Sequence, residues 1–295
     1  MVSTGNFADL FTPGFRVIFQ EKFMSYPEQY SKYFNLKTST RNHEEDSAVT
    51  GFGLAPVKNQ GAGIHYDDPM QGFDVRYDHL TYGLGFIVTR ELAEDDEYRA
   101  IAKMPASLAR SMRLTVETDA ANVYNRAFNP SYTGGDGKEL CATDHPLVGG
   151  GTQKNELSAA ADLDATSFEQ ALIDIADTTD DRGLLMALQP KMLVVPPELD
   201  WTAAKMLESS LDPDTSNNAV NPAKGRLPYS VWNYLTDPDA WFILCDAHEV
   251  NFFWRRKIEF VQDNDFDTEN AKYKSTMRFS RGWSMPWGVF GSPGV

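Results

Sequence analysis

Apolar residues recur every three or four positions over a long stretch in the first half of the chain. This spacing aligns their side chains along one side of an α-helix. Pro105 has no N–H group, so the helix either begins or kinks there. From Met104 to Phe128 the helix would be about 37 Å long at 1.5 Å per residue. The fold must therefore cover one side of a single long helix. The apolar series consists of Ile101, Met104, Leu108, Met112, Val116, Ala120, Val123 and Ala127.

The size and composition of the chain indicate an ordinary globular protein. Its 295 residues suggest two domains, or one domain with a large insertion. Hydrophobic residues make up 42% and charged residues 23% of the chain, which is typical of folded proteins. No apolar run reaches the roughly 20 residues that cross a bilayer, and the start "MVSTGNFADLF" lacks the layout of a signal peptide. Only two cysteines are present, so we expect synthesis and folding in the cytosol without a disulfide framework.

The charge balance excludes one class of function. The chain has 27 Lys and Arg against 42 Asp and Glu, a formal net charge of −15. The overall field of such a chain does not attract nucleic-acid phosphate. The local basic run "WRRK" at 254–257 is most simply the solvated face of a strand. We therefore expect no sequence-specific DNA reader.

The first 40 residues are rich in aromatic side chains, and Phe7, Phe11, Phe15, Phe19 and Phe23 are spaced four apart. This spacing predicts a helix from about Phe11 to Met24, with a proline and a glycine near its start. A single amphipathic helix at a chain end must bury its apolar side against something. Another subunit is one candidate for that role.

Residues 41–90 have a different pattern, with many glycines and alternating apolar positions. The alternation predicts strands joined in one long hairpin, with a change of register, interpreted as a bulge, near His79. The first arm has too few apolar residues to form its own core, so we expect the hairpin to project. Its alternating positions are Phe73, Val75, Tyr77, Leu80, Tyr82, Leu84, Phe86 and Val88.

A polar loop, "NPSYTGGDGKELCATDHPLVGGGTQKN", separates the long helix from what reads as a second domain. A helix is predicted in "TSFEQALIDIADTTDD", with a capping box from Thr166 to Glu169. A buried strand at 191–196, a helix in "ELDWTAAKMLESS" and strands around "YSVWNYL" and "AWFILCD" follow. No repeat of 20 to 50 residues is visible.

The stretch "DNDFDTEN" at 263–270 places acidic residues on alternate positions, as a calcium loop does. Counted from Asp263, however, the sixth and twelfth positions hold Thr268 and Lys274, which provide neither the hinge glycine nor the closing carboxylate. The flanking segments "VNFFWRRKIEFVQ" and "AKYKSTMRFSRGWS" read as two strands. We predict a solvated hairpin tip, with a weak cation site as the alternative.

The sequence matches known catalytic motifs poorly. A nucleophile elbow, a zinc-protease helix and a phosphate loop are all missing from the sequence. The sharpest enzymatic possibility pairs Cys141 with His145 and Cys245 with His248, which could in principle bind zinc in a cytosolic metal-dependent hydrolase. Their spacing does not match a compact zinc site, and Cys245 lies in an apolar strand where a thiol usually packs. The remaining histidines, His43, His65 and His79, read as polar surface or turn residues.

Three stretches of the sequence resemble those of a known protein family: "TDHPLVGGGTQKN", "PKMLVVPPELDWTAAKML" and "DNDFDTENAKYKSTMRFSRGWSMPWGVFGS". Taken with the order of arm, hairpin, long helix, α/β insertion and returning strands, the chain resembles the major capsid proteins of tailed bacteriophages and prophages. The resemblance covers essentially the whole chain and is to the phage Mu-like branch of the Hong Kong 97 phage capsid fold. It implies an α+β fold and a structural protein, not an enzyme, located in the virion head after synthesis in the bacterial host cytoplasm.

The resemblance also implies a division of the chain. Residues 1–40 would be an N-terminal arm and 41–90 an extended loop. Residues 91–135 and 251–295 would form a peripheral domain that contains the long spine helix. Residues 136–250 would form an axial domain at the centre of each capsomer, and "DNDFDTEN" would be the tip of a peripheral hairpin.

The implied function is self-assembly into pentamers and hexamers of an icosahedral shell around double-stranded DNA, without sequence-specific binding and without a membrane. The sequence shows no long charged leader of the kind that serves some relatives as a scaffold, so we expect scaffolding by a separate protein. A portal and a decoration protein would be further partners. No cofactor, metal site or covalent crosslink is expected. A tail or accessory virion protein is a further alternative. The residues expected to contact neighbouring subunits are Phe11, Phe15, Phe19, Phe73 and Tyr77.

Overall fold

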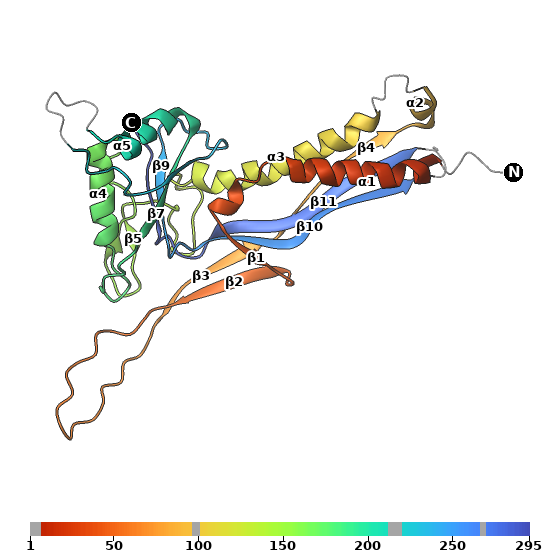
Figure 1. Ribbon diagram of the computed structural model, residues 1–295. Coiled ribbons are helices and arrows are strands. Elements are labelled where there is room, and N and C mark those ends of the chain that lie inside the picture. The colour runs from red at the N-terminus through yellow and green to blue at the C-terminus, as the bar shows by residue number, and fades with distance from the viewer. Residues whose placement is uncertain (1–6, 96–100, 212–219, 266–269) are drawn as a thin grey trace.

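The computed structural model describes residues 7–95, 101–211, 220–265 and 270–295, and shows an elongated molecule (Figure 1). Two long helices and a long sheet extend to one side, a compact part lies at the other end, and a hairpin projects away from both. The helices are α1 (Phe7–Ser25), α2 (Arg90–Asp95), α3 (Met104–Asn125), α4 (Ala165–Ala176) and α5 (Asp200–Glu208), with short 3-10 turns η2 (Tyr30–Lys32), η3 (Ile101–Lys103) and η4 (Pro197–Leu199).

The strands form two larger sheets and two small ones. In the long sheet the order is β1-β10-β11-β4, and only β1 runs parallel to its neighbour. In the short sheet the order is β12-β9-β7-β8, with β8 parallel to β7. The strands are β1 (Asn35–Thr38), β2 (His43–Val49), β3 (Gln71–Asp78), β4 (Leu80–Val88), β5 (His145–Pro146), β6 (Thr152–Gln153), β7 (Pro190–Val195), β8 (Tyr229–Val231), β9 (Trp241–Cys245), β10 (Val250–Asn264), β11 (Ala271–Trp283) and β12 (Val289–Ser292).

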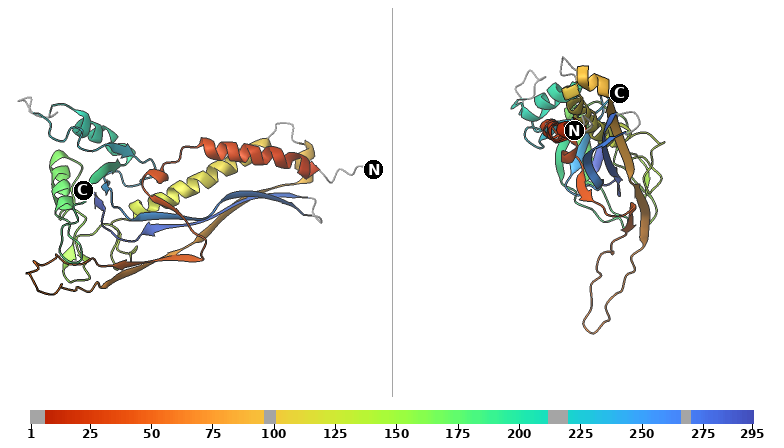
Figure 2. Two further views of the ribbon diagram at one scale, coloured as in Figure 1. Left: turned by 60° about the horizontal axis from the view of Figure 1, so that its bottom comes forward. Right: turned by 90° about the vertical axis from the view of Figure 1, so that its right-hand side faces the viewer.

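The long helix predicted from apolar spacing is α3, and Pro105 lies in its first turn, so the helix begins there and is not kinked. Helices α1 and α3 lie side by side along one face of the long sheet (Figure 2). Val116 and Ala120 of α3 are fully buried between these layers. The helix predicted at Phe11–Met24 is also confirmed, as the larger part of α1.

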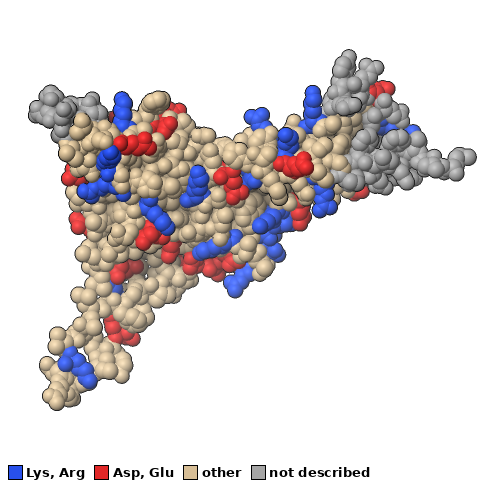
Figure 3. All heavy atoms as spheres, in the orientation of Figure 1, with Lys and Arg blue, Asp and Glu red and all other residues tan. Residues whose placement is uncertain are grey.

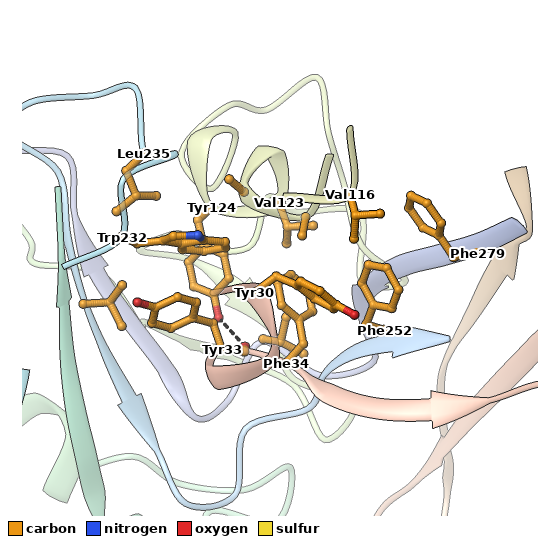
Figure 4. Packing of buried hydrophobic residues seen from close by; sticks show 14 of the residues in the cluster. Tyr30, Tyr33, Phe34, Val116, Val123, Tyr124, Trp232, Leu235, Phe252 and Phe279 are labelled. Atoms are coloured by element: carbon orange, nitrogen blue, oxygen red, sulfur yellow. Dashed lines mark hydrogen bonds between the residues drawn. The ribbon is translucent and has the colours of Figure 1, made fainter. Parts of the chain in front are cut away.

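An aromatic cluster joins the long-sheet half to the short-sheet half (Figure 4). The segment after α1 inserts Tyr33, whose ring stacks on Trp232 with centroids 4.2 Å apart. Tyr124 of α3 meets Trp232 edge-on and donates its hydroxyl to the backbone oxygen of Tyr33 at 3.0 Å. Phe34 contacts Trp232, Tyr124 and Phe252 edge-on. Aromatic pairs of this kind add packing energy beyond the area they bury, so the two halves are firmly joined.

The short sheet has a second core on its other face, built around Phe168, Leu193 and Trp241. Helix α4 covers this core, but its cap differs from the prediction. Asp164 is the N-cap, and its carboxylate accepts from the backbone N–H of Ser167 at 2.6 Å. The capping box therefore begins at Asp164, two residues before the predicted start at Thr166. Residues that can form a capping box occur at both places in the sequence, but the helix backbone begins after Asp164.

The predicted long hairpin is corrected by the structure. Strand β2 pairs with β3, but β4 pairs with β11 and belongs to the long sheet. The change of register at His79 separates two strands of different sheets. His79 is not a surface residue as predicted: it is buried and bonded to the hydroxyls of Ser39 and Ser280.

The predicted strand pair around "DNDFDTEN" is present as β10 and β11, with bulges near Arg256. Asp265 accepts from Lys272 Nζ at 2.7 Å, and its backbone N–H donates to Asn270. The tip itself, residues 266–269, lies outside the described residues. Among the described residues, no helix is long and apolar enough to cross a membrane.

Candidate assembly surfaces

The most exposed apolar surface of the described chain lies on the projecting loop between β2 and β3, residues 50–70 (Figure 1). Leu54, Val57 and Tyr66 are more than four-fifths exposed, at 81%, 93% and 87%. Between Thr50 and Tyr66 only Lys58 carries a charge, and Figure 3 shows the loop as mainly uncharged. Large exposed apolar patches mark contacts with other molecules. The extended-loop patch consists of Phe52, Leu54, Val57, Ile64 and Tyr66.

The two arms of this loop are tied together at its base. The N–H of Thr50 donates to Met70 O, and the N–H of Met70 donates to the Thr50 hydroxyl, each at 2.9 Å. The N–H of Gly53 donates to Asp67 Oδ2 at 2.8 Å, and this bond is the main reason that the pKa of Asp67 is lowered. The loop base is therefore ordered by hydrogen bonds even though its distal part has no core.

Further exposed apolar side chains lie on β4, the edge strand of the long sheet. Leu80 and Leu84, on one face of the strand, and Ile87, on the opposite face, are about half exposed, at 49%, 50% and 56%. An edge strand presents unpaired backbone groups as well as side chains, so it is a natural place for another chain to bind.

Two of the predicted contact residues on the arm are covered by the chain itself. Phe15 is buried and meets Tyr273 edge-on, with centroids 5.4 Å apart. Phe19 is 1% exposed and stacks on Phe260 at 4.9 Å. The side chain of Phe11 lies outside the described residues. An intersubunit role for these three residues stays a prediction, and for Phe15 and Phe19 it would require α1 to leave the long sheet.

The predicted contact residues at the hairpin base also differ in exposure. Tyr77 is 3% exposed, and its hydroxyl lies 2.7 Å from the Ser284 hydroxyl. Burial raises the pKa of Tyr77 to about 12. Phe73 is half-buried in a small hollow that Asp136 and Trp287 also line. Tyr77 therefore fastens the hairpin to the body, whereas part of Phe73 is open to a neighbour.

A buried polar network lies where the short sheet meets the loop after α3. His145 Nδ1 is 2.5 Å from Asp136 Oδ2, and its Nε2 is 3.0 Å from Asn155 Oδ1. The Asn155 amide group donates to three backbone carbonyls, of Leu140, Pro286 and Val289. These donor bonds fix the orientation of the amide, so Asn155 Oδ1 must accept a hydrogen from His145 Nε2. Both nitrogens of His145 are thus engaged in structural bonds.

The alternative zinc site is not supported by this arrangement. Cys141 and Cys245 are buried in two different cores, and burial raises the pKa of both thiols, to about 12 for Cys245. A thiol held protonated is a poor metal ligand and a poor nucleophile. Within the described part of the chain, no group of three or more Cys, His, Asp or Glu side chains could hold a metal ion.

Glu156, next to this network, gives a prediction on pH. Burial and the neighbouring Glu139 carboxylate raise its pKa to about 7. The folded state therefore binds a proton that the unfolded state releases above about pH 4.5, so this contribution to stability is present at low pH and is lost as pH rises through 7. Glu156→Gln is expected to raise the free energy of unfolding by about 1–2 kcal/mol at pH 8.5, after allowance for partial exposure, and to change it little at pH 4.5.

Urea denaturation at the two pH values would measure this effect, with Glu198→Gln, a change at an exposed carboxylate, as the control. Equal stabilities of the Glu156→Gln and unmodified chains at pH 8.5 would contradict the assignment.

Several important residues were not found by sequence reasoning. The extended-loop patch lies inside the glycine-rich stretch singled out above, and its signal was an unusual number of apolar residues without a strand or helix period. Asn155 is the last residue of the string "TDHPLVGGGTQKN", but nothing in the string gives its five side-chain hydrogen bonds. Arg182, described below, had no sequence signal.

The projecting apolar loop and the apolar side chains of the edge strand are surfaces that another chain could cover. Comparison with known proteins agrees. A model of the family described as "Phage capsid protein" matches residues 73–291. No curated protein matches the sequence.

Solved capsid structures have the same fold at low sequence identity. The procapsid of bacteriophage JBD30 matches with a TM-score of 0.52 and 12% identity, covering 99% of this chain and 76% of the other. The capsid of the same phage matches with a TM-score of 0.58 and 13% identity, over 74% of this chain and 94% of the other. The capsid of Mycobacterium phage Patience gives 0.54 and 11%, over 99% and 88%.

The chain belongs to the phage capsid protein family. The predictions of a major capsid protein in the virion head and of a structural, non-enzymatic role are confirmed by this membership. The Hong Kong 97-type fold with mixed helix and strand content and a long helix is confirmed as well. The Mu-like branch of the family stays a prediction.

Proposed function

We propose that copies of this chain form pentamers and hexamers that tile the icosahedral shell, and that the extended loop of each copy lies across a neighbour. The observation that carries this proposal is the extended-loop patch, which exposes five large apolar side chains. They stay exposed in one chain, whereas a neighbour with its own exposed apolar side chains on β4 can cover them. Repeated contacts of this kind close into rings when the rotation between copies is fixed.

The division into arm, extended loop, peripheral domain and axial domain is part of this proposal. Support comes from the separate core of the short sheet, whose residues lie mainly within 136–250. Three strands pair across the proposed boundaries. In the segment 1–40, β1 pairs with β10 of the long sheet; in the segment 41–90, β4 pairs with β11 of the same sheet; and in the segment 251–295, β12 pairs with β9 of the short sheet. These strands join the proposed arm and extended loop to the peripheral domain, and the peripheral domain to the axial domain.

The proposed partners are further copies of this chain, a scaffolding protein, a portal and a decoration protein. For decoration, the support is that a JBD30 capsid decorated with minor capsid protein trimers matches this fold with a TM-score of 0.55. The arm residues Phe11, Phe15 and Phe19 and the hairpin residues Phe73 and Tyr77 remain proposed subunit contacts. Packaged DNA would be enclosed without sequence-specific binding, because the chain is strongly acidic.

Sedimentation velocity of the purified chain at increasing concentration, with electron microscopy of the fastest fraction, tests the proposal. We expect pentamers, hexamers or closed shells. Tubes or single rings would favour a tail or accessory protein. A chain that stays monomeric at every concentration, with and without co-expressed scaffolding protein, would contradict self-assembly.

The distribution of charge predicts how assembly depends on salt. Residues 136–250 contain 20 Asp and Glu but 7 Lys and Arg, which leaves the proposed axial domain with nearly all of the net negative charge. Bringing several such domains to one axis is opposed by electrostatic repulsion, which salt screens. Raising NaCl from about 50 mM to about 500 mM is expected to speed assembly by about tenfold, measured by light scattering. Slower assembly at high salt would show instead that attractive ion pairs dominate the contacts.

A further inference from the structure

Arg182 connects the extended loop to a distant part of the chain. Its Nη2 donates to the backbone oxygen of Asp68 at 2.5 Å, and its Nη1 lies 3.6 Å from Asp67 Oδ1. The side chain of Arg182 is 20% exposed and that of Asp67 is 31% exposed, so these two side chains are half-buried, whereas the bond to Asp68 lies at the surface. These residues are more than a hundred positions apart in sequence, and no other described side chain forms an ion pair with the loop.

Arg182 contacts the loop at the place where the two arms of the loop are bonded to each other. Asp67 also accepts from the N–H of Gly53, on the opposite arm of the loop. One carboxylate therefore joins both arms to Arg182. Beyond this point the loop carries Leu54, Val57 and Ile64, which are largely exposed. The direction in which these side chains point is set by what holds the loop at Asp67.

The turn that presents Arg182 is itself ordered. The Asp180 carboxylate accepts from the backbone N–H groups of Arg182 and Leu184, at 2.9 and 2.8 Å. Gly183 has φ +75°, a left-handed conformation that glycine adopts without strain. The Asp181 carboxylate accepts from the N–H of Val148 at 2.9 Å and so fastens the turn to the neighbouring loop. Arg182 thus extends from a rigid support, which lowers the entropy lost when its contact forms.

We propose that Arg182 is a positioning residue for assembly: through Asp67 and Asp68 it fixes the angle at which the extended loop leaves the body, and so presents the extended-loop patch to a second copy of this chain. The inference rests on the proposed function, in which the loop crosses to a neighbour. A loop already held in its bound direction loses less conformational entropy on binding, so it associates faster than a free one. The contact is kept, not broken, when copies assemble.

The test compares Arg182→Ala and Arg182→Lys with the unmodified chain, and uses Lys205→Ala as a control that removes the same charge from an exposed position of α5. In the unassembled chain, hydrogen exchange at the N–H groups of Gly53 and Met70 is expected to be about tenfold faster in Arg182→Ala, and intermediate in Arg182→Lys. The rate of shell formation is expected to fall by about tenfold in Arg182→Ala and to be partly restored in Arg182→Lys. Lys205→Ala should change neither measurement.

The two readouts separate this inference from the function on which it rests. If the unmodified chain forms no shells, the proposed function fails, while hydrogen exchange still tests the contact of Arg182 with the loop. If exchange in Arg182→Ala is unchanged, or if exchange is faster but shells form at the unmodified rate, the positioning role is overturned and the proposed function stands.

Discussion

A chain in which the five residues of the extended-loop patch are replaced by serine is expected to fold normally and to form no shells. In the free chain these side chains are already exposed, so their replacement should change the free energy of unfolding by less than about 1 kcal/mol. In a shell each would be covered by a neighbour, and covering a large apolar side chain contributes about 1.5–3 kcal/mol. The loss over five side chains predicts a fall in shell yield of more than about 100-fold.

Sedimentation velocity and calorimetry would measure yield and thermal stability side by side. A triple variant, Lys58→Ser, Asn59→Ser and Gln60→Ser, alters exposed polar residues of the same loop and is the matched control. We expect it to assemble normally. Shells of the five-serine variant at the unmodified yield would show that the loop is not an assembly surface.

The elements whose sequence patterns are local could be predicted well. Helix α3 follows from apolar residues at helical spacing over its whole length, and Pro105 marks its first turn. Strands β10 and β11 follow from two apolar runs around a polar turn. In both cases the signal and the structure involve the same short stretch, so no knowledge of distant partners is needed.

Long-range partners could not be predicted, and the arm shows why. Its four-residue spacing predicts the helix α1 but does not say what covers it. Phe15 and Phe19 pack against Tyr273 and Phe260, more than two hundred residues further along the chain. Periodicity carries no information on which distant surface is complementary, so another subunit and the same chain were equally compatible with the pattern.

The same limit explains the correction at β4. Alternating apolar residues from Leu80 to Val88 predict a strand but not its neighbour, and adjacency in sequence favoured pairing within the hairpin. In the structure β4 pairs with β11, and at Gly85 the two backbones lie so close that a Cβ atom added there would be 2.4 Å from the backbone oxygen of Tyr273. The close approach of two backbones is visible only in three dimensions.

Asn155→Ala is expected to destabilise the fold more than any other single polar substitution discussed above. Asn155 is 5% exposed, and its side chain accepts from Ala142 N and His145 Nε2 and donates to three carbonyls that include Pro286 and Val289. Alanine would remove all of these bonds, although Pro286 O would keep its long 3.4 Å bond from the N–H of Val289. Each buried group that is left without a partner and that water cannot reach costs about 1–3 kcal/mol. Since some will find water, we expect a loss of about 4 kcal/mol in the free energy of unfolding and a Tm lower by about 10 °C.

Thermal and urea unfolding of the unassembled chain would test this expectation, with Asn233→Ala, at an exposed asparagine, as the control. A second variant, Asn155→Asp, keeps the shape and one acceptor oxygen but replaces the donor group with an oxygen that faces three carbonyls. If the donor bonds matter most, Asn155→Asp will be at least as unstable as Asn155→Ala near neutral pH. If Asn155→Asp is instead as stable as the unmodified chain, the carbonyls do not need the amide, and the loop after α3 must be held to the C-terminal strand by the His145 contacts and by backbone bonds alone.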